Sequence, residues 1–283
     1  MITKILACTD GSRSGDAATQ YGIALAQQCQ AALTGLHVLD SRVLEGPLMA
    51  DISGWIGAQP YGNQLQQFRE VLEEKGRSIL QAFEQLCEAA KLGNAKGIIR
   101  MGHPSRVILD EEAEADLVVI GRHGIHADMV GAALGSTAER LIRHSETPCM
   151  VTPPEFNPIC KILLAYDGSD HARHALSFAL ELVRSLDAEL ILLTVAEEAA
   201  GADTARALSQ EALREVEQQG TKAVPLIVES PRAADAIQAS CEEQGCDLIV
   251  MGTYGYSRIR EMILGSTTTR VTTQAKVPVL LVR

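Results

Sequence analysis

Two stretches of the chain repeat one pattern of glycines and hydroxyl side chains. Residues 116–124 read DLVVIGRHG and residues 247–255 read DLIVMGTYG, and a GST triplet follows each stretch, at 135–137 and 265–267. Glycines let a chain turn tightly and let its N–H groups approach oxygen atoms closely. A triplet that opens a helix adds N–H groups, the positive end of the helix dipole and hydroxyl donors. The repeat therefore predicts a phosphate-binding loop in each half.

An aspartate occupies the same place in each half, shortly after an apolar run. The chain reads KILACTDGS at 4–12 and KILLAYDGS at 161–169, so Asp10 and Asp167 correspond to each other. A carboxylate can accept hydrogen bonds from ribose hydroxyls or from an exocyclic amine. An aspartate and an anion-binding loop on one scaffold predict a nucleotide site, or its remains, in each half.

The acidic composition limits what else the protein can bind. The chain carries 25 Lys and Arg against 36 Asp and Glu, a net charge of −11, and no basic run is visible. Nucleic-acid backbones need clustered basic residues, so we expect no nucleic-acid partner. No apolar stretch approaches the roughly 20 residues of a membrane span, and the N-terminus leads directly into an apolar run. We therefore expect neither a signal peptide nor a membrane partner.

The cysteines favour a reducing compartment. The chain has seven of them, an odd number, with no CxxC pair, and most lie within apolar runs. Reduced, buried thiols in a cytoplasmic protein are the expected state. A redox-sensing role for Cys8, Cys241 or Cys246 is the alternative.

Short apolar runs alternate with longer amphipathic runs, which is typical of βα units and a parallel sheet. The chain of 283 residues has the length of about two domains, and the repeat predicts them at 1–152 and 159–283. We expect an α/β fold of two tandem doubly wound, Rossmann-like domains, each a five-stranded parallel sheet with helices on both faces. The predicted strands are 3–9, 32–38, 95–101, 116–121 and 149–152, then 161–166, 189–195, 223–228, 247–252 and 277–282. The predicted helices of the second half are 170–186, 203–219, 231–244 and 266–275, with Pro231 in a first turn.

Two segments depart from the repeat. Residues 40–63 occur only in the first half and are rich in glycine and proline, which predicts a loop. This insertion carries Trp55, the one tryptophan, and is interpreted either as a lid over the first site or as a contact surface. The sequence PPEFNP at 153–158 is a short, stiff linker, so the two domains are expected to pack against each other.

Ligands of open α/β sheets bind beyond the carboxyl ends of the strands, where the strand order reverses. Asp10 and Asp167 follow the first strand of each half, and the loops at Gly121 and Gly252 follow the fourth. If these strands are neighbours, each aspartate meets its glycine loop. No Walker lysine and no nucleophile with an adjacent base is visible, so the aspartates are interpreted as ligand anchors. We expect no dedicated enzymatic activity, with slow ATP hydrolysis as an alternative.

These motifs resemble the universal stress protein family of the UspA type, twice and over nearly the whole chain. ATP-binding members carry Gly-x-x-Gly, nine residues and Gly-Ser/Thr, which the second half matches at Gly252, Gly255, Gly265 and Ser266. The resemblance implies an adenine nucleotide alpha hydrolase-like fold and an ATP-binding protein of stress response or signalling that acts through nucleotide-dependent conformation or assembly. We expect ATP, with Mg²⁺, as the cofactor. The implied second-half pocket is Ala165, Tyr166, Asp167, Val195, Met251, Gly252, Gly255, Gly265, Ser266 and Thr267.

The resemblance also implies that residues 277–282 pair with residues 149–152. One chain would then form an intrachain pseudo-dimer. Further assembly of such chains into a homo-oligomer is left as an alternative. A nucleotide-free interaction module of the same fold is the competing hypothesis.

The first half departs from the family spacing. Ten residues separate Gly124 from Gly135 instead of nine, and Gly131 is an additional glycine. The extra residue is either absorbed by a bulge at Gly131 or misplaces Ser136, so nucleotide binding is expected first of all in the second half. By position the first-half pocket is Cys8, Thr9, Asp10, Val38, Ile120, Gly121, Gly124, Gly135, Ser136 and Thr137.

Histidines near the loops raise the question of a metal site. His123 and His126 share an HxxH spacing, as do His171 and His174, but no third Cys or His ligand recurs at a useful distance. Exposed polar side chains are therefore expected, and no metal. His123 lies between two loop glycines, where it could reach a phosphate.

Overall fold

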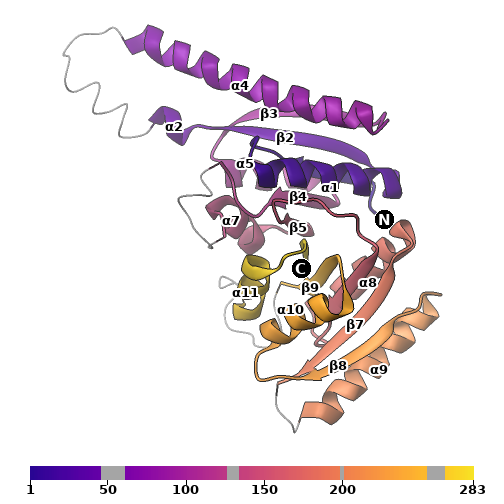
Figure 1. Cartoon of the computed structure of the whole chain (residues 1–283). Helices are drawn as coiled ribbons and strands as arrows, with labels where there is room; N and C mark the ends of the chain where they lie inside the picture. Colours follow the sequence, from indigo (N-terminus) through magenta and orange to yellow (C-terminus); the bar gives the residue numbers. More distant parts are fainter. Residues whose placement is uncertain (46–60, 126–133, 198–200, 254–264) are drawn as a thin grey trace.

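One sheet of ten strands runs through both halves of the chain (Figure 1). The computed structural model describes residues 1–45, 61–125, 134–197, 201–253 and 265–283. The strand order is β3-β2-β1-β4-β5-β10-β9-β6-β7-β8. The first half contributes β1 (Lys4–Cys8), β2 (Ala32–Asp40), β3 (Ala95–Gly102), β4 (Leu117–Gly121) and β5 (Cys149–Thr152). The second contributes β6 (Lys161–Ala165), β7 (Glu189–Ala196), β8 (Val224–Glu229), β9 (Leu248–Gly252) and β10 (Val279–Val282).

Strands are parallel within each half and antiparallel where the halves meet. β1 lies between β2 and β4, and β6 lies between β7 and β9, so the first and fourth strands are neighbours as predicted. At the junction Val279 pairs with Val151 and Leu281 with Cys149. The expected pairing of the last strands is confirmed, and the two halves form one continuous sheet.

Helices cover both faces of the sheet. On one face lie α1 (Arg13–Cys29), α4 (Tyr61–Ala89), α8 (Asp170–Leu186) and α9 (Ala202–Gln218). On the other lie α5 (Pro104–Glu111), α7 (Ser136–His144), α10 (Ala233–Gln244) and α11 (Ser266–Gln274), with the 3₁₀ turn η1 (Glu112–Glu114) after α5. Leu117 and Val119 belong to one buried cluster and Val118 to the other, because alternate strand residues face opposite sides. Each cluster contains residues of both halves, so the two halves share their cores.

The Asp-Gly-Ser motif is the turn that starts α1. Asp10 Oδ1 accepts the Ser12 N–H at 3.0 Å, and Ser12 Oγ accepts the Gly15 N–H at 3.1 Å as the helix cap. Between them Gly11 has φ of +76°, a conformation that suits glycine. The turn at the start of α8 repeats these hydrogen bonds with Asp167 and Ser169. The motif therefore fixes each aspartate at the carboxyl end of its strand.

The ends of every predicted strand and helix lie within two residues of the observed ends, which is the ordinary uncertainty in assigning them. The placement of Pro231 in a first helical turn was wrong. α10 begins at Ala233, and the extended backbone of its cap, Arg232, keeps the proline outside the helix.

The loop predicted for residues 40–63 was wrong at both ends. Asp40 still belongs to β2, a short helix α2 spans Arg42–Glu45, and the long helix α4 already begins at Tyr61. First-turn N–H groups have no partner within a helix, so a glycine at position 62 costs that turn little. Residues 46–60, with Trp55, lie outside the described residues.

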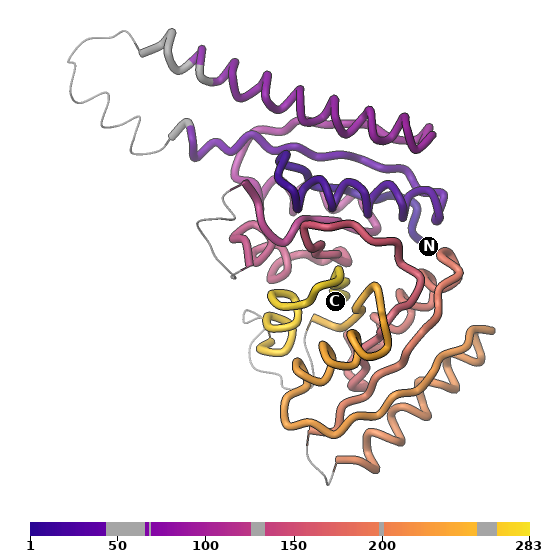
Figure 2. Tube along the Cα trace, viewed as in Figure 1, coloured from indigo at the N-terminus to yellow at the C-terminus, as the bar shows by residue number. Residues whose placement is uncertain are grey.

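The linker leads from β5 past α1 into the second half (Figure 2). Tyr21 Oη accepts the Asn157 N–H at 3.1 Å, and the Tyr21 ring meets Phe156 edge to face, with centroids 4.8 Å apart. Because α1 holds the linker in this way, the two halves are packed together as expected. Among the described residues, no helix is both long enough and apolar enough to cross a membrane.

Candidate functional site

A cavity of about 290 Å³ opens at the carboxyl ends of β1, β2 and β4 in the first half. Its volume is near the lower end of the range for small-molecule sites, roughly 300 Å³. Additional walls come from α2, α4 and the start of α5. The lining includes every residue predicted for the first-half pocket: Cys8, Thr9, Asp10, Val38, Ile120, Gly121, Gly124, Gly135, Ser136 and Thr137.

Asp10 ties the first strand to the glycine loop. Its Oδ2 accepts the Ile125 N–H at 3.0 Å, while Oδ1 is bound to the turn before α1. A Cβ at Gly124 would lie 2.7 Å from Oδ2, so a larger residue there could not let the loop approach the carboxylate. A carboxylate has about four acceptor positions, so Asp10 keeps the capacity to accept from a ligand hydroxyl or amine.

Gly121 and Gly252 end the fourth strands and allow close packing there. A Cβ at Gly121 would lie 2.7 Å from the backbone of Ser14 in α1, and one at Gly252 would lie 2.9 Å from His171 Cβ in α8. Sequence reasoning gave these glycines a role in turning and in phosphate approach. Their contact with the first turn of a helix is an additional role that required the three-dimensional arrangement.

The start of α7 offers backbone donors beside the cavity. Its cap residue, Gly135, has no side chain that could satisfy the first-turn N–H groups, and both Gly135 and Ser136 line the cavity. Such donors suit an anion. Gly135 (φ −61°, ψ 140°) and Gly265 (φ −56°, ψ 142°) have the same conformation, so the extra residue of the first half leaves the helix start unchanged. Gly131 lies outside the described residues.

Apolar walls form the rest of the cavity. Val38, Ile108 and Ile120 line it together with Cys8. Burial raises the pKa of the Cys8 thiol, and the nearby Glu112 and Asp10 carboxylates raise it further. Cys8 therefore stays protonated near neutral pH and acts as a small apolar side chain, as expected from its place in a strand.

The second-half residues surround the corresponding strand ends. Ala165 pairs with Met251 across β6 and β9, and Tyr166 and Met251 are buried. Asp167 Oδ1 accepts two hydrogen bonds from Ser169, one from its backbone N–H at 3.0 Å and one from the hydroxyl Oγ of the serine at 2.6 Å. Val195 lies at the end of β7, and Gly265, Ser266 and Thr267 start α11. Gly255 lies outside the described residues.

The histidines take different positions. His123 lines the cavity and is half-buried. His171 packs against Gly252, and burial lowers its pKa. Like His123 it is half-buried, so the expectation of a solvent-exposed side chain was wrong for both. His174 Nδ1 is 2.9 Å from the Arg283 carbonyl, and His126 lies outside the described residues. No group of three or more His, Cys, Asp or Glu in the described part of the chain could hold a metal ion.

Arg122 is the residue that sequence reasoning missed. It lies between the loop glycines, yet its side chain is buried and reaches the other half. Its Nη2 donates to the Ala275 carbonyl at 2.5 Å and its Nη1 to the Thr273 carbonyl at 3.3 Å, at the end of α11. In the opposite direction, Arg283 Nη1 donates to the Ser145 carbonyl at 3.2 Å, at the end of α7. A cation at a helix C-terminus is favourable, and each half supplies one to the other.

Replacing Arg122 by alanine is expected to lower the free energy of unfolding by about 1–3 kcal/mol, because buried carbonyls at the end of α11 lose their donor. Urea denaturation of the full chain measures the loss. Arg214→Ala, at an exposed position of α9, is the control and should stay within about 0.5 kcal/mol of wild type. If Arg122→Ala were as stable as Arg214→Ala, the hydrogen bonds of Arg122 to the end of α11 would contribute nothing to the free energy of unfolding.

Comparison with known proteins gives a consistent result. Residues 1–153 and 159–283 each match the model of the universal stress protein family. A universal stress protein of Synechocystis is 30% identical over 290 residues, which cover 100% of both chains. One of Mycolicibacterium smegmatis is 26% identical over 299 residues, covering 99% of this chain and 96% of the relative. A crystal structure of a universal stress protein from Archaeoglobus fulgidus superposes with a TM-score of 0.75 at 23% identity, over 99% of this chain and 98% of that one.

Proposed function

The chain belongs to the universal stress protein family, and from this premise we propose that it is an ATP-binding protein of stress response or signalling. Its two domains would be residues 1–152 and 159–283, each with a nucleotide site at its strand ends. The observation that carries the proposal is the first-half cavity, where Asp10, the glycine loop and the start of α7 meet. A cytoplasmic location belongs to the proposal and is supported by seven unpaired cysteines.

The chemistry of the cavity fits an adenine nucleotide. Apolar side chains from β2, β4 and α5 can hold a flat ring, and Asp10 can accept from the ribose. The loop and the uncapped first turn of α7 supply N–H donors for phosphate oxygens. Mg²⁺ is usually bound by substrate phosphates with one or two carboxylates, and Asp10 and Asp40 are the carboxylates in the lining.

Nucleotide binding would be transmitted through Arg122. The residue belongs to the glycine loop, and its guanidinium holds the end of α11, whose other end starts the second-half site. A change of loop position would therefore alter a contact between the halves. In this proposal, occupancy of the first site biases the packing of the second half.

Isothermal titration of nucleotide-free protein with ATP and Mg²⁺ tests the proposal. Saturable heat is expected, and its complete absence would reject nucleotide binding. Analysis of the small molecules released on denaturation is a second measurement, in which adenine nucleotide near one equivalent supports the proposal.

Gly265→Ala is expected to remove ATP binding from the second half without disturbing the fold. Among the described residues, the nearest atom to the new Cβ would be Thr268 Oγ1 at 3.5 Å, an ordinary contact, and the backbone conformation suits alanine. A phosphate held by the first turn of α11 would meet the methyl group instead. Titration should show one site fewer than wild type, and thermal unfolding should be unchanged. Gly93→Ala, where no atom lies within 4 Å, is the matched control. Unaltered stoichiometry in Gly265→Ala would move the site elsewhere.

The competing hypothesis is a nucleotide-free interaction module that uses the same fold and its dimerising edge strands. In this chain β5 and β10 pair with each other. An interaction module would therefore have to use another surface, and no described feature favours one.

A further inference from the structure

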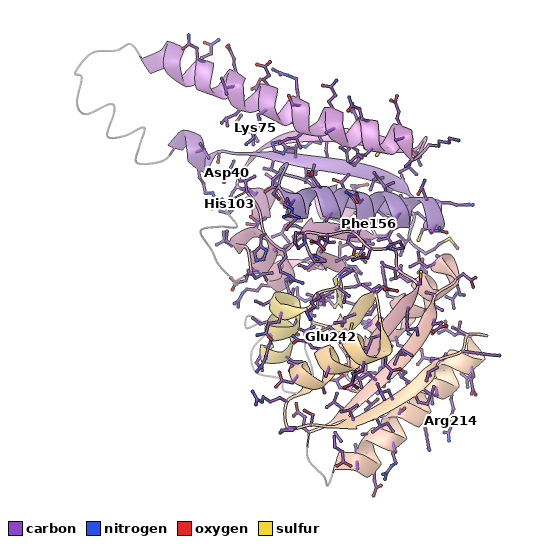
Figure 3. All side chains as sticks on the ribbon, viewed as in Figure 1. Asp40, Lys75, His103, Phe156, Arg214 and Glu242 are labelled. Atoms are coloured by element: carbon purple, nitrogen blue, oxygen red, sulfur yellow. The ribbon has the colours of Figure 1, made fainter. Side chains whose placement is uncertain are left out.

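Cationic side chains gather on one side of the first-half cavity. Arg42 and Lys75 line it, from α2 and α4. His103 caps the start of α5, next to Pro104 in the lining, and Arg140 Nη1 lies 3.3 Å from His103 Nε2. We call Arg42, Lys75, Arg106 and Arg140, the cationic side chains on this side, the cation cluster. Lys75, Asp40 and His103 lie at the same end of the first half, beside the end of β2 (Figure 3).

The cluster holds more positive than negative charge. Asp40 is the one carboxylate bound to it among the described residues, through Arg42 Nε at 2.9 Å and Nη2 at 2.5 Å. Within that part of the chain, Lys75, Arg106 and Arg140 form no ion pair. The protein as a whole has a net charge of −11, so this local excess of positive charge is opposite in sign to the overall charge.

The state of His103 reflects this surplus. Burial and the nearby charges of Arg42, Arg140 and Arg106 lower its pKa, while Asp40 acts in the opposite direction. The geometry agrees with a neutral ring, because Nε2 accepts from Arg140 and Nδ1 can donate to Ser105 Oγ at 3.0 Å. Three arginine side chains close to one ring mark a place where an anion would be stabilised.

At the corresponding described positions of the second half, the arginines are paired with a carboxylate. Arg270 is the fifth residue of α11, as Arg140 is of α7, but its Nη2 forms an ion pair with Asp235 Oδ1 at 2.7 Å. Arg232 binds the same carboxylate at 3.3 Å, and Ser230 stands before Pro231 where His103 stands before Pro104. At these described positions of the second half both arginines are therefore paired with a carboxylate. The second-half loop, which carries Arg258 and Arg260, lies outside the described residues.

We propose that the cation cluster binds the outer phosphates of a nucleoside polyphosphate in the first-half cavity, through Arg42 and Lys75 of its lining and through Arg140 beside His103. The first half then distinguishes nucleotides by the number of phosphates. This inference rests on the proposed nucleotide binding. Charge-assisted hydrogen bonds to phosphate oxygens supply the selectivity.

The test compares AMP with ATP by calorimetry on the full chain carrying Gly265→Ala, so that the heat reports on the first half. We expect ATP to bind at least about tenfold more tightly than AMP, a ratio that one or two charged hydrogen bonds provide. In the double variant Lys75→Ala and Arg140→Ala this ratio should fall to about twofold or less. Arg270→Ala in the same background is the matched control and should leave the ratio unchanged.

The outcomes are separable. AMP and ATP binding with equal affinity, or a ratio unaffected by the double variant, would overturn the cation cluster as a phosphate site and leave nucleotide binding intact. No binding of either nucleotide by the wild-type chain would overturn both proposals. If adenosine 3′,5′-bisphosphate bound more tightly than AMP while ATP did not, the cation cluster would not bind the phosphates attached at the 5′ position.

Discussion

Leu280→Asp is expected to lower the free energy of unfolding by about 4 kcal/mol or more and to destabilise both halves together. Leu280 is fully buried in β10, where it pairs with Met150 of β5. It belongs to a buried hydrophobic cluster with residues from both halves, so the new carboxylate would have to be buried among apolar side chains. The strand junction is therefore the position where one charge affects the whole molecule.

Urea denaturation followed by far-UV circular dichroism measures the effect of Leu280→Asp. Val224→Asp in β8 is the matched control, since that side chain is 58% exposed at the edge of the sheet. The control should lose less than about 1 kcal/mol. If one half of Leu280→Asp still unfolded at the wild-type urea concentration, the shared core would not couple the unfolding of the two halves.

Gly121→Val is expected to lower the free energy of unfolding by about 3 kcal/mol and to abolish nucleotide binding in the first half. The new Cβ would lie 2.7 Å from the backbone carbon and oxygen of Ser14. A backbone cannot rotate away as a side chain can, so β4 and α1 must separate. Because Gly121 and the nearby Asp10 both line the cavity, the separation would also displace the site.

Thermal unfolding and ATP titration of Gly121→Val give the two readouts. Gly93→Val is the control, because no atom lies within 4 Å of a Cβ at that position and its φ is not positive. It should keep both stability and binding. Normal stability of Gly121→Val would show that the close approach of β4 and α1 is not required.

Much of the site could be predicted from local patterns. Apolar runs located all ten strands, because a parallel strand covered on both faces is a continuous apolar segment. The Asp-Gly-Ser turn could be placed because its hydrogen bonds join residues two or three positions apart. The neighbouring first and fourth strands then bring Asp10 to its glycine loop, and all ten positions predicted for the first half line one cavity.

The tertiary structure decided the contacts between distant segments. Arg122 meets carbonyls 151 and 153 residues away, and nothing in the local spacing of the loop indicates that its side chain is buried. The cation cluster collects residues from α2, α4, α5 and α7, whose approach depends on how helices pack on the sheet. The spacing of the loops favoured the second half as the nucleotide site. The cavity lined by described residues lies in the first half, while residues 254–264 of the second-half loop lie outside the described part of the chain. The sequence alone determined the strands and the repeated loop–aspartate design, because these depend on neighbours along the chain. Only the tertiary structure decided how the two copies differ, because that difference depends on side chains brought together by packing.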